Sequence, residues 1–353
     1  MKLKYKENCI EALEHTEAFW RGDYIDRPVV LCATPRETDI PCPRQPTDMR
    51  ERWTDIDYLI REDEYRAASR HWLGEMIPSR TVMTGWCLHF GFPVTFQENT
   101  VWTNRSMDEL PESLNWDKLW ENEWFELMLE YTEKACRHAQ GKYNVNTPPI
   151  LPPNDILASI RGADNFLMDL LDSPEIIQRH LSEMRVARSK MLKAFESVRA
   201  KYFDWHETYF LWSHDAVGGW QSDVSCMFSS GMFKEYVVPE LEYVSQSYDK
   251  IFYHLDGPGS ERHLEHIYTF PKIFLIEWVP GKGNPHGAHW LDLYKEIQEM
   301  GKAVIVLYPE KNDFEPLIKE LDPAKTIFHF YVEDKRTGLE AIEYIKELTR
   351  RYH

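Results

Sequence analysis

Two short apolar runs in the second half of the chain each end in polar side chains that could hold a metal ion. The first leads into His254, Asp256 and Gly257, and the second ends at Glu277. Alternate side chains of an extended strand point to the same side, so His254 and Asp256 could share one cation. Imidazole nitrogen and carboxylate oxygen suit zinc or a harder divalent ion. The alternative is a hydrogen-bonded His254 and an Asp256 that only starts a turn at Gly257.

Other polar side chains follow neighbouring predicted strands. We expect Glu277 beside His254, as a third metal ligand or a catalytic general base, or else as a buried carboxylate paired with an arginine. His329 ends the last predicted strand and is a candidate ligand, acid or merely hydrogen-bonded histidine. His214 and Asp223 follow the predicted fourth strand, where they are either catalytic groups or ordinary turn residues.

Arginines and tryptophans near strand ends are candidates for substrate binding. Arg36 and Arg44 stand in a long loop after the first predicted strand. Guanidinium groups bind carboxylates bidentately, although the acidic residues interleaved in the loop offer surface pairing as the alternative. Trp86, Trp212 and Trp278 could line a pocket for a flat or sugar-like ligand, or belong to the core.

Strands that alternate with helices must position these residues. We expect helices at 8–22, 54–76, 117–140, 154–171, 173–201, 232–249, 291–300, 314–321 and 339–351. We expect strands at 27–33, 80–84, 143–150, 209–213, 251–254, 273–276, 303–307 and 326–330. This order predicts an α/β protein with a (β/α)8 TIM barrel, in which the groups at the C-terminal strand ends converge. We predict one domain over 1–353, with a helical extension at 1–26.

Composition narrows the classes of function. The 58 acidic and 41 basic residues give a net charge of −17, which opposes binding to nucleic acid or to an anionic membrane surface. No apolar run approaches the roughly 20 residues of a membrane span. The first residues lack the apolar segment of a signal peptide, so we expect a cytoplasmic protein. The six cysteines form no CxxC pair, and no phosphate-binding glycine motif is present. A homodimer is one alternative for the oligomeric state.

Three stretches resemble the uroporphyrinogen decarboxylase-like superfamily. They are 155–175, Asp223 with 229–240, and the strand that ends in His254-x-Asp256-Gly257. The resemblance extends over roughly 27–350 and implies a (β/α)8 barrel. The superfamily includes tetrapyrrole decarboxylases and corrinoid-dependent methyltransferases. Its motifs are specific for the superfamily rather than for one reaction.

The decarboxylases of this superfamily hold substrate carboxylates with arginines after the first strand, and Arg36 and Arg44 match these loosely. They also bring a histidine from the last strand to the substrate, and His329 in Phe328-His329-Phe330 is its counterpart here. The resemblance therefore offers decarboxylation of uroporphyrinogen or another polycarboxylate as one function.

The methyltransferases carry His-x-Cys-Gly and a further cysteine, which hold zinc. Here Asp256 replaces that cysteine, and no cysteine follows Cys226. The resemblance then implies a harder metal site of His254, Asp256 and Glu277. We expect metal-assisted methyl transfer to a small acceptor, with a corrinoid carried by a partner protein. A barrel that binds a sugar-like molecule without catalysis is a third hypothesis.

Overall fold

The computed structural model describes residues 2–81 and 88–353 and has a mixed α/β fold. Its strands are β1 (Val29–Pro35), β2 (Arg70–Gly74), β3 (Ser79–Arg80), β4 (Val94–Phe96), β5 (Val101–Thr103), β6 (Asn144–Val145), β7 (His206–Thr208), β8 (Leu211–Ser213), β9 (Val217–Gln221), β10 (Lys250–Asp256), β11 (Ile273–Val279), β12 (Ala303–Leu307) and β13 (Thr326–Tyr331). Seven of them form one sheet in the order β2-β1-β13-β12-β11-β10-β9. All neighbours in this sheet are parallel except β1 and β2.

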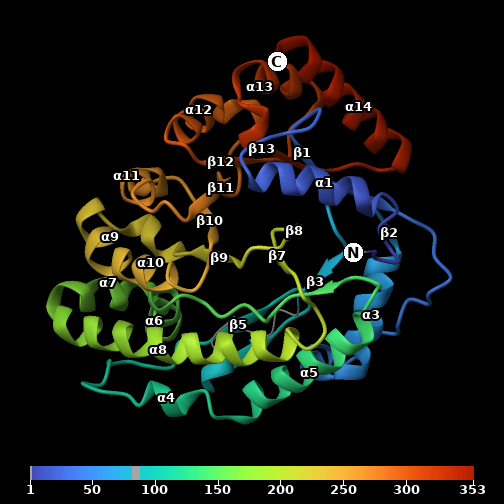
Figure 1. Ribbon diagram of the computed structural model, residues 1–353. Helices are drawn as coiled ribbons and strands as arrows, with labels where there is room; N and C mark the ends of the chain where they lie inside the picture. Colours follow the sequence, from blue (N-terminus) through green and yellow to red (C-terminus); the bar gives the residue numbers. More distant parts are fainter. Residues whose placement is uncertain (1, 82–87) are drawn as a thin grey trace.

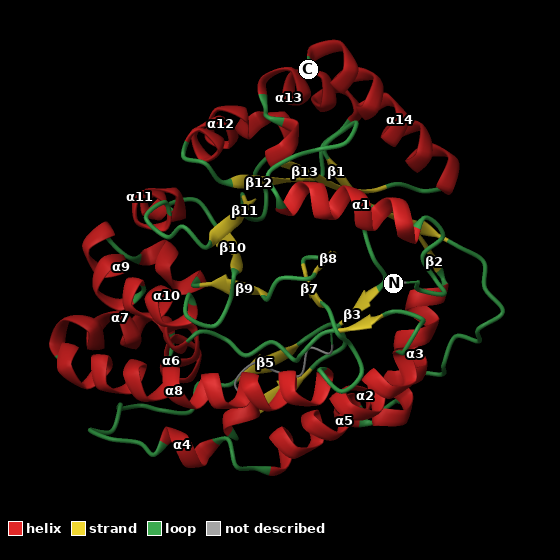
Figure 2. Ribbon diagram, in the orientation of Figure 1, coloured by secondary structure: helices red, strands yellow, loops and turns green. Residues whose placement is uncertain are grey.

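The strands follow one another around a ring, and the helices other than α1 lie outside it (Figures 1 and 2). The helices are α1 (Cys9–Trp20), α2 (Met49–Thr54), α3 (Ile56–Ala68), α4 (Trp116–Leu119), α5 (Glu123–Ala139), α6 (Pro153–Arg161), α7 (Ala163–Asp172), α8 (Pro174–Arg199), α9 (Ser230–Tyr236), α10 (Val238–Val244), α11 (Leu264–Ile267), α12 (Leu291–Glu299), α13 (Phe314–Glu320) and α14 (Lys335–Tyr352). Alternation of strand and helix along the chain produces this arrangement, because each parallel connection needs a crossover.

The inner face of the sheet forms a separate apolar cluster. Alternate residues of the strands contribute to it, among them Leu31, Leu275 and Ile305, because successive side chains of a strand point to opposite faces. Phe19 of α1 and Leu211 of the β7–β8 hairpin pack into the same cluster. Figure 1 shows this hairpin inside the ring of strands. The β7–β8 hairpin, which precedes β9 in the chain, thus fills part of the interior of the ring of strands.

The prediction of one long helix at 54–76 is wrong. The helix α3 ends at Ala68, and β2 then pairs antiparallel with β1. The reason is a free edge of β1, where five residue pairs of the ladder outweigh the local preference for helix. Gly74 closes this strand at φ +59°, and a Cβ atom there would lie 2.1 Å from the carbonyl oxygen of Val30.

The prediction of the fourth strand at 209–213 is also wrong. Tyr209 and Phe210 form the turn of the β7–β8 hairpin, and the strand that joins the parallel sheet is β9. Its Gly218 and Gly219 look like a loop in the sequence. Gly218 is needed because it packs against the ring of Tyr248, where a Cβ atom would come within 2.6 Å of ring carbons.

Of two expected strands, one lies partly outside the described residues and the other is shorter than predicted. The 80–84 strand is represented by β3, and 82–87 lie outside the described residues. The 143–150 strand is reduced to β6, because Pro148 and Pro149 cannot donate to a ladder. β3 and β6 are parallel neighbours. Within 2–81 and 88–353, no ladder joins β1 to β3 or β6 to β9.

Three predicted helices are interrupted. The 117–140 helix is split into α4 and α5, and the side chain of Asn122 caps α5. Gly162 at φ +83° separates α6 from α7 within 154–171. In 232–249, α9 and α10 meet at Val237, and Pro239 in the first turn of α10 starts the second helix.

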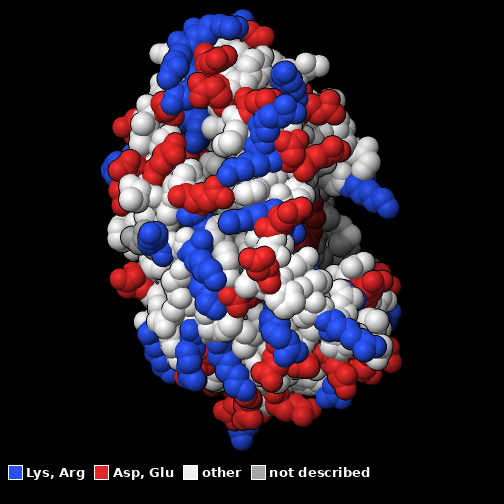
Figure 3. Space-filling view, turned by 90° about the vertical axis from the view of Figure 1, so that its right-hand side faces the viewer, with Lys and Arg blue, Asp and Glu red and all other residues white. Residues whose placement is uncertain are grey.

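Surface charge of both signs is mixed on the face shown in Figure 3, where lysines and arginines stand among acidic side chains. Although acidic residues outnumber basic ones in the sequence, the acidic side chains on this face have many basic neighbours. Among the helices that the structure describes, none is both long and apolar enough to cross a membrane.

Candidate metal centre

Three side chains with metal-binding atoms converge at the C-terminal ends of β9 and β10. Asp223 begins the short 3-10 helix Asp223–Met227 directly after β9, while His254 and Asp256 lie two residues apart on β10. One ligand atom from each lies within 4.8 Å of the others. All three side chains are partly buried. The sequence had placed Asp223 among the catalytic groups, and the structure brings it together with the predicted metal-binding pair.

Asp223 has a buried oxygen without a hydrogen-bond partner among the described residues. Its Oδ1 atom is this orphan, whereas Oδ2 accepts a hydrogen bond from Nε2 of Gln221 at 2.8 Å. Burial raises the pKa of Asp223, the positive charge of His254 lowers it, and the negative charge of Asp256 raises it again. A bound cation would satisfy the orphan oxygen and offset the repulsion between the two carboxylates.

Asp155 holds Asp223 in place. It lies in the first turn of α6, and its two carboxylate oxygens accept hydrogen bonds from the backbone N–H groups of Asp223 and Val224 at 3.1 and 2.9 Å. Burial, together with the negative charge of Asp223, raises the pKa of Asp155 to about 7. This role of Asp155 was not predicted, because Asp155 and Asp223 are separated by 68 residues.

Glu277 orients His254 on the neighbouring strand. The register pairs these two residues, which confirms that they are neighbours in the sheet. Oε2 of Glu277 is hydrogen-bonded to Nδ1 of His254, so Nε2 of a neutral His254 is left with a free lone pair. Burial lowers the pKa of His254, but the bond to Glu277 and the nearby carboxylates outweigh it, so the pKa is raised.

A chain of hydrogen bonds continues from Glu277 to the end of β13. The hydroxyl group of Tyr209 donates to Oε1 of Glu277 at 2.5 Å, and its oxygen lies 2.9 Å from Nδ1 of His329. Nε2 of His329 lies 3.1 Å from the hydroxyl oxygen of Tyr331. Burial lowers the pKa of His329 to about 4. A neutral His329 therefore donates through Nδ1 to Tyr209 and accepts from Tyr331 through Nε2.

Tyr209 reaches this position through an unusual turn. Tyr209 and Phe210 are the two residues between the paired strands β7 and β8, with φ angles of 50° and 63°. Two-residue hairpins of this kind need positive φ at both positions, which glycine and asparagine adopt at less cost. Strained positions of this type are often found at functional sites. Sequence reasoning missed Tyr209 because its turn lacks those residues.

His214 does not join the other site residues. It precedes β9 and so lies at the opposite end of this strand from Asp223. Its side chain is 72% exposed, and Nε2 lies 3.7 Å from a carboxylate oxygen of Glu17. The proposed catalytic role of His214 thus has no support from its position.

The predicted substrate-binding residues are dispersed. Arg36 is paired with Glu7 at 3.7 Å, and Arg44 is exposed in its loop. Trp212 and Trp278 are buried in the core, where the ring of Trp278 packs against Trp290 on the outer face of β11. Trp86 lies outside the described residues.

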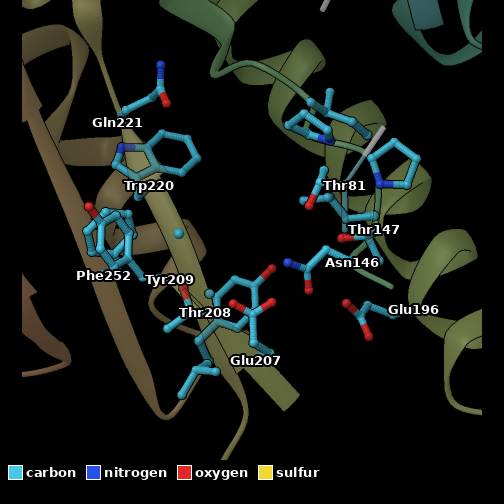
Figure 4. Close-up of a pocket in the computed structure, with 18 of the residues that line it drawn as sticks. Thr81, Asn146, Thr147, Glu196, Glu207, Thr208, Tyr209, Trp220, Gln221 and Phe252 are labelled. Atoms are coloured by element: carbon cyan, nitrogen blue, oxygen red, sulfur yellow. The ribbon is translucent and has the colours of Figure 1, made fainter. Parts of the chain in front are cut away.

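A cavity of about 270 Å³ reaches the site from the side where β6 and β9 are not joined by a ladder. Figure 4 shows Trp220 and Gln221 of β9 on one side of it and Asn146 and Thr147 on the other. Tyr209, Phe252 and His254 also line this space; aromatic rings with a few polar groups are typical of small-molecule sites.

Comparison with known proteins gives a likeness of structure but no match of sequence. Neither the models of known protein families nor the curated proteins match the sequence. Among solved structures, a methyltransferase from Methanosarcina mazei is similar, with a TM-score of 0.62 and 10% sequence identity. The alignment covers 96% of this chain and 98% of the methyltransferase. This likeness shows a shared fold.

Proposed function

We propose that this chain is a metal-dependent enzyme that transfers a methyl group to a small acceptor. We place its catalytic centre in an eight-stranded barrel formed by β1, β3, β6 and β9 to β13. The convergence of Asp223, His254 and Asp256 within 4.8 Å carries the proposal. Groups at the C-terminal ends of parallel strands are where barrel enzymes place their catalytic residues.

The side chains fit a divalent cation of zinc type or harder. Two carboxylates and one imidazole supply oxygen and nitrogen donors, and the orphan Oδ1 of Asp223 is buried beside them. Glu277 would not bind the cation but would accept a hydrogen bond from Nδ1 of His254 and so orient its ring, as carboxylates commonly do at metal-bound histidines. When bound, the cation would polarise an oxygen of the acceptor and make it more acidic.

The protein side chains would orient the acceptor and take up its proton. His254 faces the cavity, so an acceptor there lies within reach of the site. Oε2 of Glu277 shares a proton with Nδ1 of His254, and Oε1 is linked through Tyr209 to neutral His329. Glu277 and His329 are therefore the proposed proton carriers, and the hydroxyl group of Tyr209 links them.

Methyl transfer rests on the sequence resemblance and on the fold that this chain shares with a methyltransferase. A corrinoid on a partner protein is the proposed methyl donor. The test mixes EDTA-treated or metal-reloaded protein with methylcobalamin and a panel of small thiols, alcohols and amines. We expect loss of methylcobalamin absorbance that requires metal and disappears in His254→Ala. Absence of demethylation with every acceptor would contradict methyl transfer.

The two other hypotheses predict different products. Uroporphyrinogen decarboxylation should yield coproporphyrinogen without added metal, and the positions of Arg36 and Arg44 outside the cavity give it no support. A sugar-binding barrel should show saturable binding of sugars without turnover. Both assays use the same purified protein as the methyl transfer assay, so one preparation distinguishes the three functions.

A further inference from the structure

Arg188 on α8 is a buried cation that forms no ion pair with an acidic side chain in the part of the chain that the structure describes. Only 8% of the surface of Arg188 is exposed to solvent. Nε donates to the carbonyl oxygens of Ile150 and Leu151 at 3.0 and 3.2 Å, and the guanidinium group lies 4.6 Å from the ring centre of Trp220. The two terminal nitrogens have no hydrogen-bond partner among the described residues.

The acid that acts on Arg188 most is the carboxylate of Glu240, which also forms an ion pair with Arg185 at 2.7 Å. The charge of Arg188 lowers the pKa of Glu240, but no ion pair joins these two residues among those that the structure describes. Burial lowers the pKa of Arg188, since a charge removed from water is costly unless it is paired. The neighbouring Arg199 differs, because its three guanidinium nitrogens donate to Val145, Trp205 and Asn144.

Arg188 lines the same cavity as His254. Two acidic residues line it as well. Glu207 is engaged by the hydroxyl group of Ser79, by the amide of Asn144 and by the backbone N–H of Phe210, and burial raises its pKa. Glu196 is partly exposed on α8. The cavity thus combines an arginine with free donors, acidic groups that would repel a highly charged anion, and aromatic walls.

We propose that Arg188 binds the carboxylate of a small organic acid in this cavity, with the rest of the molecule directed toward His254. A planar guanidinium with two free terminal nitrogens matches one carboxylate bidentately. The volume of about 270 Å³ restricts the ligand to a small molecule. The inference that the carboxylate belongs to the substrate rests on the proposed function. Binding of a carboxylate to Arg188 does not require the metal.

The test measures carboxylate binding to EDTA-treated protein by calorimetry and thermal shift. Acetate, propionate, succinate and inorganic phosphate are titrated separately at constant ionic strength. We expect saturable stabilisation by at least one of the carboxylates, and at least tenfold weaker binding in Arg188→Gln, because one charge-assisted bidentate contact is lost. Lys190→Gln is the matched control, since Lys190 carries the same charge on the exposed side of α8, where it pairs with Asp117.

Arg188→Lys is a second variant in case Arg188→Gln does not fold. It keeps the charge but loses the planar fork, so intermediate affinity is expected. No saturable binding of any carboxylate to the wild type, unchanged affinity in Arg188→Gln, or binding of phosphate alone would overturn the proposal. Because metal is absent from this experiment, its failure is distinguishable from failure of the metal-dependent function.

Discussion

The hydroxyl group of Tyr209 lies 2.5 Å from Oε1 of Glu277, whose other oxygen is hydrogen-bonded to His254. The turn of a hairpin inside the ring of strands thereby fixes the carboxylate that orients a candidate metal ligand. The interior of this fold is filled by a segment that also contributes to the site. Tyr209 consequently has two roles: its ring packs against the interior apolar cluster, and its hydroxyl group holds Glu277 of the proposed site.

Tyr209→Phe should weaken metal binding without preventing folding. The substitution removes the hydrogen bonds to Glu277 and His329 but keeps the ring that packs against Phe252. Loss of an outer partner of a metal-bound histidine typically lowers affinity by roughly 10–100-fold. Calorimetric titration of EDTA-treated protein with Zn²⁺ and Mn²⁺ measures this. Tyr331→Phe removes only the far end of the chain, so a loss as large as that of Tyr209→Phe would contradict this account.

His329 should make stability depend on pH. Its pKa in the folded protein is lowered to about 4 by burial, whereas histidine in an unfolded chain titrates near 6.5. Above pH 6.5 both states are neutral. As the pH falls from 6.5 to 4 the unfolded chain takes up the proton more readily, so the folded state loses stability, by about 3 kcal/mol from this residue.

His329→Asn should remove this part of the acid dependence. Asparagine keeps an N–H donor for the oxygen of Tyr209 and does not titrate. Urea unfolding at pH 7, 5.5 and 4 compares the variant with the wild type and with His289→Asn, which changes an exposed histidine. Equal losses of unfolding free energy in all three proteins would show that His329 is not the source.

Asp256→Cys should shift the metal preference toward soft cations. The thiolate would replace a hard oxygen donor in the group formed with Asp223 and His254. We expect tighter Zn²⁺ and weaker Mn²⁺ binding than in the wild type, and a thiolate charge-transfer band on addition of Co²⁺. Cys42→Ser in the same background removes an exposed thiol that could bind metal elsewhere. An unchanged ratio of Zn²⁺ to Mn²⁺ affinity would show that residue 256 is not a ligand.

Gly218→Ala should destabilise the protein through β9. The added methyl group would meet the ring of Tyr248 at 2.6 Å, and overpacking of this kind costs about 1–3 kcal/mol. Gly219→Ala is the matched control in the same strand, since its nearest neighbour is Cδ1 of Phe252 at 3.5 Å, an ordinary contact. Denaturant unfolding of both variants gives the comparison. Equal stability of the two would mean that Tyr248 moves aside.

Regular alternation made much of the second half of the fold predictable from sequence. The strands that carry His254, Glu277 and His329 are where their apolar runs indicate, and their order places His254 and Glu277 side by side. The first half was harder, because short strands such as β6 and the antiparallel β2 depend on contacts with distant segments. Local patterns carry little information about such contacts.

The site was only partly predictable for the same reason. His254 and Asp256 are two residues apart, so strand periodicity alone puts them on one side. Asp223 joins them only because β9 begins after the hairpin rather than at residue 209. Asp155 and Tyr209 act across 68 residues each, on Asp223 and Glu277, and neither of these contacts can be inferred from a short stretch of sequence.

Metal binding by Asp223, His254 and Asp256 is the central claim, and calorimetric titration of EDTA-treated protein tests it most directly. We predict one divalent cation per chain in the wild type, and a loss of affinity in His254→Ala that exceeds the loss in Tyr209→Phe. His214→Ala should bind as the wild type does, because His214 lies at the other end of β9. A wild type that binds no divalent cation, or equal affinity in His254→Ala, would contradict the claim.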